Sequence, residues 1–90
     1  MDNTSRELRI LILEDVPTDA ELAVMELRAA GIALSFQCVA TRPAFESALA
    51  EFKPDIVLSD FNLPAFNGRD ALIYSRSNYP QLPVIMVTGA

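Results

Sequence analysis

The chain has 90 residues, a length that suits one modest domain, because two domains of this size would each lack a proper core. About half of the residues (51%) are hydrophobic and 21% are charged, a balance that is typical of a packed domain and argues against a disordered tail. The formal net charge of -5 disfavours sequence-independent binding to nucleic acid or to an anionic membrane surface.

The termini and the single cysteine indicate the cellular setting. Residues 1–7 are polar, have no basic start followed by an apolar stretch, and are expected to form a flexible segment without a signal peptide. No apolar run reaches the ~18 residues of a membrane span. Cys38 has no partner for an internal disulfide and lies among apolar neighbours, so we expect a buried, inert thiol and a cytoplasmic location.

The first half of the chain predicts two strands separated by a helix. Residues 8–13 form a short apolar run that is typical of a strand buried on both faces. Residues 18–30 repeat apolar side chains at helical spacing, Thr18 and Glu21 have the spacing of a capping box, and Gly31 can end the helix in a left-handed conformation. Residues 34–39 alternate apolar and polar side chains, as expected of a strand at or near a sheet edge.

The second half continues the alternation. Thr41 can cap a helix that starts near Pro43 and is stopped by Lys53 and Pro54. Residues 56–59 and 84–87 are short apolar strands, and between them a loop punctuated by Pro64 and Gly68 leads into a weaker helix over residues 69–77.

Strands that alternate with helices over these lengths predict a single α/β domain with an open parallel sheet. In such sheets ligands bind at the carboxyl ends of the strands. Three carboxylates lie there: Glu14 and Asp15 follow the first strand and Asp60 follows the third. Neighbouring carboxylates oppose folding unless they are neutralised, and oxygen-only ligands suit a hard divalent cation such as Mg²⁺. Each acid alone could equally be a solvated loop residue, but their arrival at adjacent strand ends favours a metal site.

These motifs resemble the receiver domain of bacterial response regulators and hybrid histidine kinases. The resemblance rests on the acidic pair Glu14-Asp15, on Asp60 followed by Pro64 and Gly68, and on Thr88-Gly89 after the fourth strand, and it extends from about residue 8 to residue 90. It implies a flavodoxin-like fold with strand order 2-1-3-4, in which residues 1–90 are one receiver domain that lacks the last helix, strand and helix.

The resemblance also implies the roles of single residues. Asp60 would accept a phosphoryl group from the phosphohistidine of a histidine kinase or phosphotransfer domain. Asp15, Glu14, Asp60 and the backbone carbonyl of Asn62 would hold Mg²⁺. Thr88 would donate its hydroxyl to the phosphoryl group, and Gly89 would leave room for it.

Two features depart from the family pattern. Receivers carry a lysine at the end of a fifth strand. The only lysine here, Lys53, precedes the third strand and is therefore expected at the amino ends of the strands, away from Asp60. Arg42 is the nearest cation at the carboxyl ends of the strands, and we expect it to be a solvated residue at the start of a helix. The fourth strand would also be an uncapped edge, which predicts a homodimer or larger assembly.

Three functions therefore compete. The first is a phosphoacceptor signalling module that is not an enzyme, and the second is a receiver-like fragment that acts through protein contacts without phosphorylation. The third, a flavodoxin-like cofactor binder, is disfavoured because Glu14 and Asp15 would repel a flavin phosphate.

Overall fold

The computed structural model describes residues 7–60 and 66–87, and within them strands and helices alternate along the chain. The elements are β1 (Leu8–Leu13), α1 (Pro17–Ala29), β2 (Leu34–Val39), α2 (Arg42–Glu51), β3 (Ile56–Asp60), α3 (Gly68–Asn78) and β4 (Val84–Val87). Residues 1–6, most of the segment that was expected to be flexible, lie outside the described residues. In the described ranges, none of the helices combines the length and the apolar character needed to cross a membrane.

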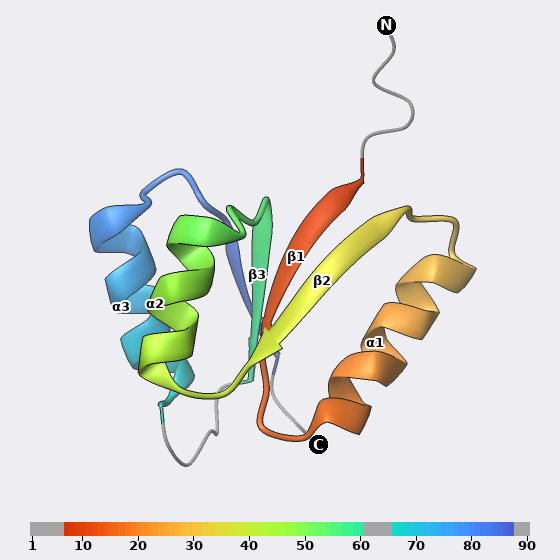
Figure 1. Cartoon of the computed structure of the whole chain (residues 1–90), viewed down its shortest axis with the longest axis horizontal. Helices are drawn as coiled ribbons and strands as arrows, with labels where there is room; N and C mark the ends of the chain where they lie inside the picture. Colours follow the sequence, from red (N-terminus) through yellow and green to blue (C-terminus); the bar gives the residue numbers. More distant parts are fainter. Residues whose placement is uncertain (1–6, 61–65, 88–90) are drawn as a thin grey trace, which may run out of the picture.

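The four strands form one parallel sheet in the order β2-β1-β3-β4, which confirms the predicted topology (Figure 1). β1 lies in the interior, between β2 and β3, because its apolar run is buried on both faces. β2 lies at an edge, which explains the alternating pattern of its side chains and its intermediate burial. Since all strands run the same way, their carboxyl ends lie together at one end of the sheet. We call this end the carboxyl edge and the opposite end the amino edge.

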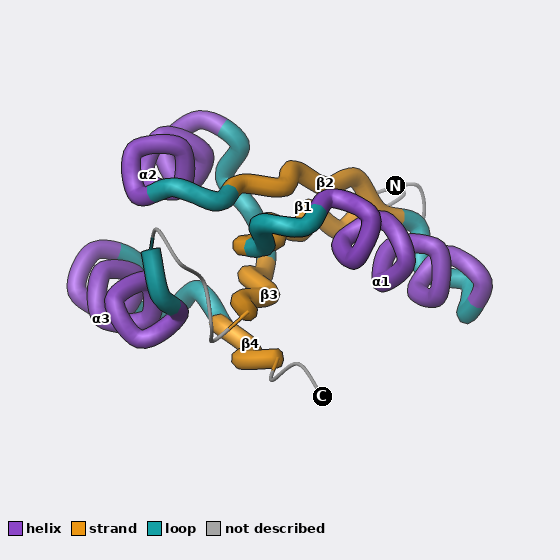
Figure 2. Tube along the Cα trace, turned by 90° about the horizontal axis from the view of Figure 1, so that it is seen from below, coloured by secondary structure: helices purple, strands orange, loops and turns teal. Residues whose placement is uncertain are grey.

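The helices cover the two faces unequally (Figure 2). α2 and α3 pack on one face, over a core that includes Leu11, Leu13, Phe45 and Val57. α1 alone lies on the other face, where Ala20 and Val24 pack against residues of β1 and β2, among them Ile10, Ile12 and Leu34. The half of this face formed by β3 and β4 is therefore less covered than the opposite face.

The prediction of a capping box at the start of α1 was wrong. The helix begins at Pro17, its N-cap is Val16, and no side chain makes a capping hydrogen bond there. Proline suits the first helical position because it lacks the N–H that would need a cap and its φ angle is already helical. Thr18 consequently lies inside the first turn. The Val16 N–H instead donates to Glu14 Oε2, 3.1 Å away.

Three other helix ends follow local rules. Gly31 has φ 95° just after α1, as predicted, and its N–H donates to the Arg28 carbonyl. Thr41 caps α2 as predicted, with its Oγ1 accepting from Ala44 N at 3.4 Å. Asn67 caps α3 by accepting from Asp70 N at 2.9 Å, so this helix starts at Gly68 rather than at residue 69.

Candidate metal and phosphoacceptor site

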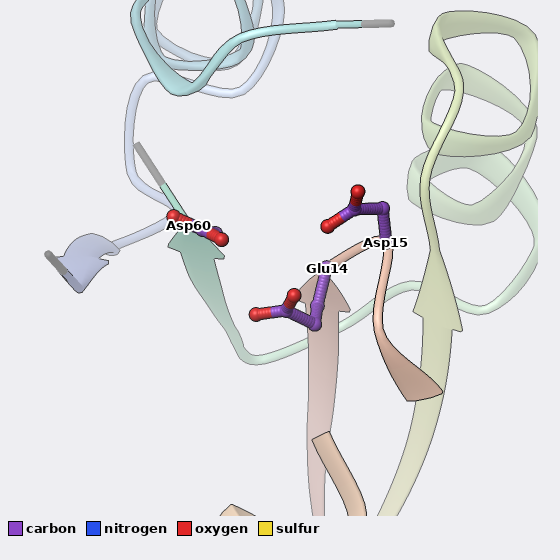
Figure 3. Close-up of side chains that lie close together, drawn as sticks. All are labelled: Glu14, Asp15 and Asp60. Carbon is purple, nitrogen blue, oxygen red and sulfur yellow. The ribbon is translucent and has the colours of Figure 1, made fainter. Parts of the chain in front are cut away.

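The three predicted carboxylates come together at the carboxyl edge of the sheet (Figure 3). Leu13 of β1 is in register with Ser59 of β3, so the next residues, Glu14 and Asp60, fall side by side. The Glu14 N–H continues the ladder by donating to the Val39 carbonyl at 2.9 Å. The pairing of β1 with β2 and β3 therefore fixes the backbone position of Glu14.

The carboxylates of Glu14, Asp15 and Asp60 are close enough to share one ion. One oxygen from each lies within 4.8 Å of the other two. Glu14 and Asp60 are half-buried and Asp15 is exposed. In Figure 3 the carboxylates of Glu14 and Asp15 both point toward the side on which Asp60 lies.

The environment of Glu14 disfavours its charged form. Burial of the side chain is the largest effect and raises the pKa of Glu14 above its ordinary value of 4.5. The hydrogen bond from Val16 N–H acts in the opposite direction, and the negative charges of Asp60, Asp19 and Asp15 raise the pKa further. A bound cation would remove this repulsion, so the site favours positive charge.

The donor set fits Mg²⁺. All three side chains offer hard oxygen ligands, which Mg²⁺ prefers, and none offers the sulfur or nitrogen that would favour zinc. Their oxygens lie within 4.8 Å of one another, so Glu14, Asp15 and Asp60 could hold one Mg²⁺ ion between them, with water as further ligands.

A small cavity of about 220 Å³ adjoins these acids on the α1 side of the sheet. Its walls come from the start of α1 and from the ends of β1, β3 and β4, and they include Glu14, Asp19, Asp60 and Val87. Since one water occupies ~30 Å³ of liquid, the space can hold several waters or one small tetrahedral group. Asp19 was not among the predicted site residues, because its place in the wall depends on how the start of α1 packs on the sheet.

Three predicted site residues lie outside the described residues: Asn62, Thr88 and Gly89. Their roles as a carbonyl ligand, a hydroxyl donor and a space-making glycine remain predictions.

Arg42 is the first residue of α2 and its side chain is 55% exposed, which confirms the expected solvated position at the start of a helix. Its Nε donates to Glu46 Oε2 at 2.8 Å, and its guanidinium lies over the rings of Phe66 (5.6 Å) and Tyr74 (5.8 Å). The ion pair lies within α2, and the ring contacts reach Phe66, which precedes α3, and Tyr74 of α3. The i,i+4 spacing of Arg42 and Glu46 could have shown the ion pair in advance.

Lys53 and Cys38 both lie outside the carboxylate cluster. Lys53 precedes β3 and so lies at the amino edge of the sheet, far from the carboxylates, as predicted. Cys38 of β2 is half-buried and not buried as expected, because β2 is an edge strand, and its Sγ–H donates to the backbone carbonyl of Glu14 at 3.4 Å. Burial, followed by the charges of Glu14 and Glu21, raises the pKa of the Cys38 thiol, in keeping with an unreactive side chain.

Comparison with known proteins identifies the family. The model of the response regulator receiver domain matches residues 10–90. Among similar proteins, "Probable transcriptional regulatory protein TcrX" of Mycobacterium tuberculosis is 35% identical over 83 residues, which are 89% of this chain and 33% of that protein. The DNA-binding response regulator MtrA of Mycolicibacterium smegmatis is 32% identical over 81 residues, 90% of this chain and 34% of that protein. The chain thus spans about a third of the length of these relatives.

Solved structures agree with this assignment. The MaeR response regulator bound to beryllium trifluoride matches with a TM-score of 0.71 and 28% identity, over 92% of this chain and 68% of that one. The signal receiver domain of a Luxo repressor protein from Vibrio parahaemolyticus matches with a TM-score of 0.76 and 26% identity, over 93% and 65% of the two chains. The chain belongs to the response regulator receiver domain family.

Proposed function

We propose that Asp60 is the phosphoacceptor of a two-component phosphorelay and that it works with a bound Mg²⁺ ion. The observation that carries this proposal is the convergence of Glu14, Asp15 and Asp60 within 4.8 Å at the carboxyl edge of the sheet. A receiver domain with such a cluster has both a nucleophilic carboxylate and the ligands for a cation that would balance phosphoryl charge.

The residues divide the work as follows. Asp15, Glu14, Asp60 and the backbone carbonyl of Asn62 would hold the ion. A bound Mg²⁺ supplies positive charge that offsets the charge on the phosphoryl oxygens. Half-burial of Glu14 and Asp60 limits competing water around the cluster. Thr88 would donate a hydrogen bond to a phosphoryl oxygen, and Gly89 would leave space beside it.

The reaction moves one phosphoryl group between two side chains. An Asp60 carboxylate oxygen attacks the phosphorus of a phosphohistidine on a histidine kinase or phosphotransfer domain. A new P–O bond forms as the P–N bond breaks, and the released imidazole takes up a proton from solvent. The product is an acyl phosphate on Asp60, and no redox partner is needed.

The setting of the domain follows from its relatives and its charge. TcrX is named as a transcriptional regulator and MtrA as DNA-binding, but both are about three times as long as this chain. We propose that residues 1–90 receive the phosphoryl group in the cytoplasm and do not themselves bind nucleic acid, because their net charge is -5.

The test is phosphorylation by a small donor. After incubation with acetyl phosphate and Mg²⁺, intact-mass spectrometry should show the addition of one phosphoryl group, and Asp60→Asn should show none. Asp70→Asn is the matched control, because Asp70 is an exposed carboxylate on α3 and is not part of the cluster. Labelling that persists in Asp60→Asn, or that does not need Mg²⁺, would contradict the proposal.

A second function, an interaction module that works without phosphorylation, has one observation in its favour. The chain's only lysine, Lys53, lies at the amino edge, away from Asp60. Within residues 1–90, no lysine would lie near Asp60 to offset the negative charge of a phosphoryl group. We therefore expect any phosphorylated form of these residues to be short-lived. A parent chain that stays unlabelled at saturating acetyl phosphate and Mg²⁺ would favour this second function.

A further inference from the structure

The outer face of α3 carries a basic and apolar patch. Arg69, Leu72, Ile73 and Arg76 follow the i, i+3, i+4, i+7 spacing that places side chains on one face of a helix. Both arginines are exposed and Ile73 is 54% exposed. We call these four residues the α3 patch.

The arginines of the α3 patch are not used within the described chain. Arg9, Arg28 and Arg42 each donate a hydrogen bond to a carbonyl or carboxylate. In residues 7–60 and 66–87, no ion pair or side-chain hydrogen bond engages Arg69 or Arg76. In a protein with a net charge of -5, two unused cations beside an exposed isoleucine mark a surface for an acidic, partly apolar partner.

The outer face of α1 has the complementary character. Leu22 and Met25 are 58% and 63% exposed, the highest values among the exposed large hydrophobic residues, and Ala29 continues their row at i+7. The exposed carboxylates of Glu21 and Glu26 border this row on its two sides, as 3.6 residues per turn require. We call these five residues the α1 patch. It explains why α1 is apolar both toward the sheet and away from it.

One copy of the chain cannot bring the two patches together. α1 lies on one side of the sheet and α3 on the other (Figure 2). The residues of both patches belong to neither core cluster, and most of them are exposed. A second copy can do so. We infer that the α3 patch of one chain docks the α1 patch of a second copy.

Charge pairs around a small apolar centre would stabilise this contact. Arg69 and Arg76 are about 10 Å apart along α3, and Glu21 and Glu26 are ~7.5 Å apart along α1, at about 1.5 Å per residue. Two crossing helices can therefore pair opposite charges around a small apolar centre of Ile73 against Leu22 and Met25. A single helix pair buries less than the ~1,200 Å² of a stable interface, so the association is weak and weakens with added salt.

The symmetry of the contact also follows. The two patches differ, so the contact is heterologous, and each bound chain still offers one free patch of each kind. The chains consequently add head to tail at high concentration. The inference uses no residue of the metal and phosphoacceptor site, so its test is independent of the proposed function.

Charge reversal on each patch provides the test. The first variant is Arg69→Glu with Arg76→Glu, and the second is Glu21→Lys with Glu26→Lys. Alone, each should associate at least about tenfold more weakly than the parent, because like charges now face each other. Mixed in equal amounts, they should form complexes again, since each reversed patch meets its opposite. Sedimentation velocity of each variant and of the mixture measures the gain on mixing.

The gain on mixing separates this contact from any other mode of self-association. A contact through the sheet would be the same in each variant alone and in the mixture. Arg69→Lys with Arg76→Lys is the matched control, keeps the charge and should associate like the parent. Circular dichroism confirms that each variant is folded. No gain on mixing, or weaker association in only one of the two charge-reversed variants, would overturn the inference.

Discussion

Asp15 is the exposed member of the carboxylate cluster, so its charge can be removed without leaving a buried polar group. In metal-free buffer Asp15→Asn should raise the melting temperature by a few degrees, because a repulsion of ~0.5 kcal/mol is lost and ~1 kcal/mol corresponds to 4–8 °C in a domain of this size. The parent should gain up to about 2.7 kcal/mol of unfolding free energy at Mg²⁺ concentrations a hundredfold above Kd. Thermal melts across a Mg²⁺ series measure both effects.

The control for this prediction is Asp70→Asn, which should respond to Mg²⁺ as the parent does. An undiminished Mg²⁺ response in Asp15→Asn would show that Asp15 is not a ligand.

Glu14 should make the stability of the metal-free chain depend on pH. Its folded pKa is raised, chiefly by burial, so the native state binds this proton more tightly than the unfolded state. The resulting stability is fully present below the ordinary pKa of 4.5 and is lost as the pH rises through the higher folded pKa. Glu14→Gln removes the charge and can still accept from Val16 N–H. We therefore expect this variant to be more stable than the parent at neutral pH.

The comparison is made by urea unfolding in EDTA across this pH window. The advantage of Glu14→Gln should shrink toward pH 4.5 and below. An advantage that does not change with pH would mean that the substitution acts through packing and not through the charge.

At the scale of single elements, the end of α1 depends on one residue. Gly31 has φ 95°, and a Cβ added there would meet nothing within 4 Å, so only the backbone conformation opposes a side chain. Gly31→Ala should therefore cost ~1 kcal/mol of unfolding free energy, the usual penalty of a left-handed conformation. Gly31→Asn should cost less, because asparagine tolerates this region. Chemical denaturation of the two variants gives the difference, and equal losses would contradict the account.

The elements show what sequence patterns can and cannot predict. Short apolar runs predicted β1, β3 and β4, because apolar side chains on both faces are typical of parallel strands. The expected burial was wrong for β4, whose Ile85 and Val87 are exposed. The start of α1 was mispredicted because Thr18 and Glu21 satisfy the capping-box spacing, while Pro17 had already taken the first helical position. Spacing along the chain does not show whether the capping box or the proline begins the helix. That depends on the backbone direction with which the chain leaves β1.

The site was predictable to the extent that it depends on topology. Strand ends in a parallel sheet meet at one edge, so Glu14, Asp15 and Asp60 could be brought together from the order of the elements. The part played by Asp19 and the contacts of Arg42 with the rings of Phe66 and Tyr74 could not, because they depend on how the helices pack.

At the scale of the whole molecule, the described sheet is left uncovered on one part of one face. Ile85 and Val87 of β4 are 48% and 50% exposed, and Ile85 is in register with Leu58, which lines the α1 side of the sheet. α1 covers the β1 and β2 half of that face (Figure 2). Within the described residues β4 pairs only with β3, so its outer backbone groups are also open to another strand.

This arrangement predicts that the 90-residue chain self-associates through β4. Burial of apolar surface is worth ~25 cal/mol per Å², and parallel sheets are normally covered on both faces. Ile85→Lys should weaken the association at least about tenfold, because burying an unpaired ammonium in that contact is costly. Ile32→Lys is the matched control: Ile32 is a similarly exposed isoleucine (38%) after α1 and remote from β4, so this substitution should have no effect.

Both substitutions are best compared in a chain that also carries Arg69→Glu and Arg76→Glu, which removes the contact between the helix patches. Sedimentation equilibrium of the two then reports only association through the sheet. A chain that is monomeric at high micromolar concentration before Ile85 is changed would refute the prediction. Equal weakening by Ile32→Lys would refute it too, since the effect would then come from added charge and not from the uncovered face of β4.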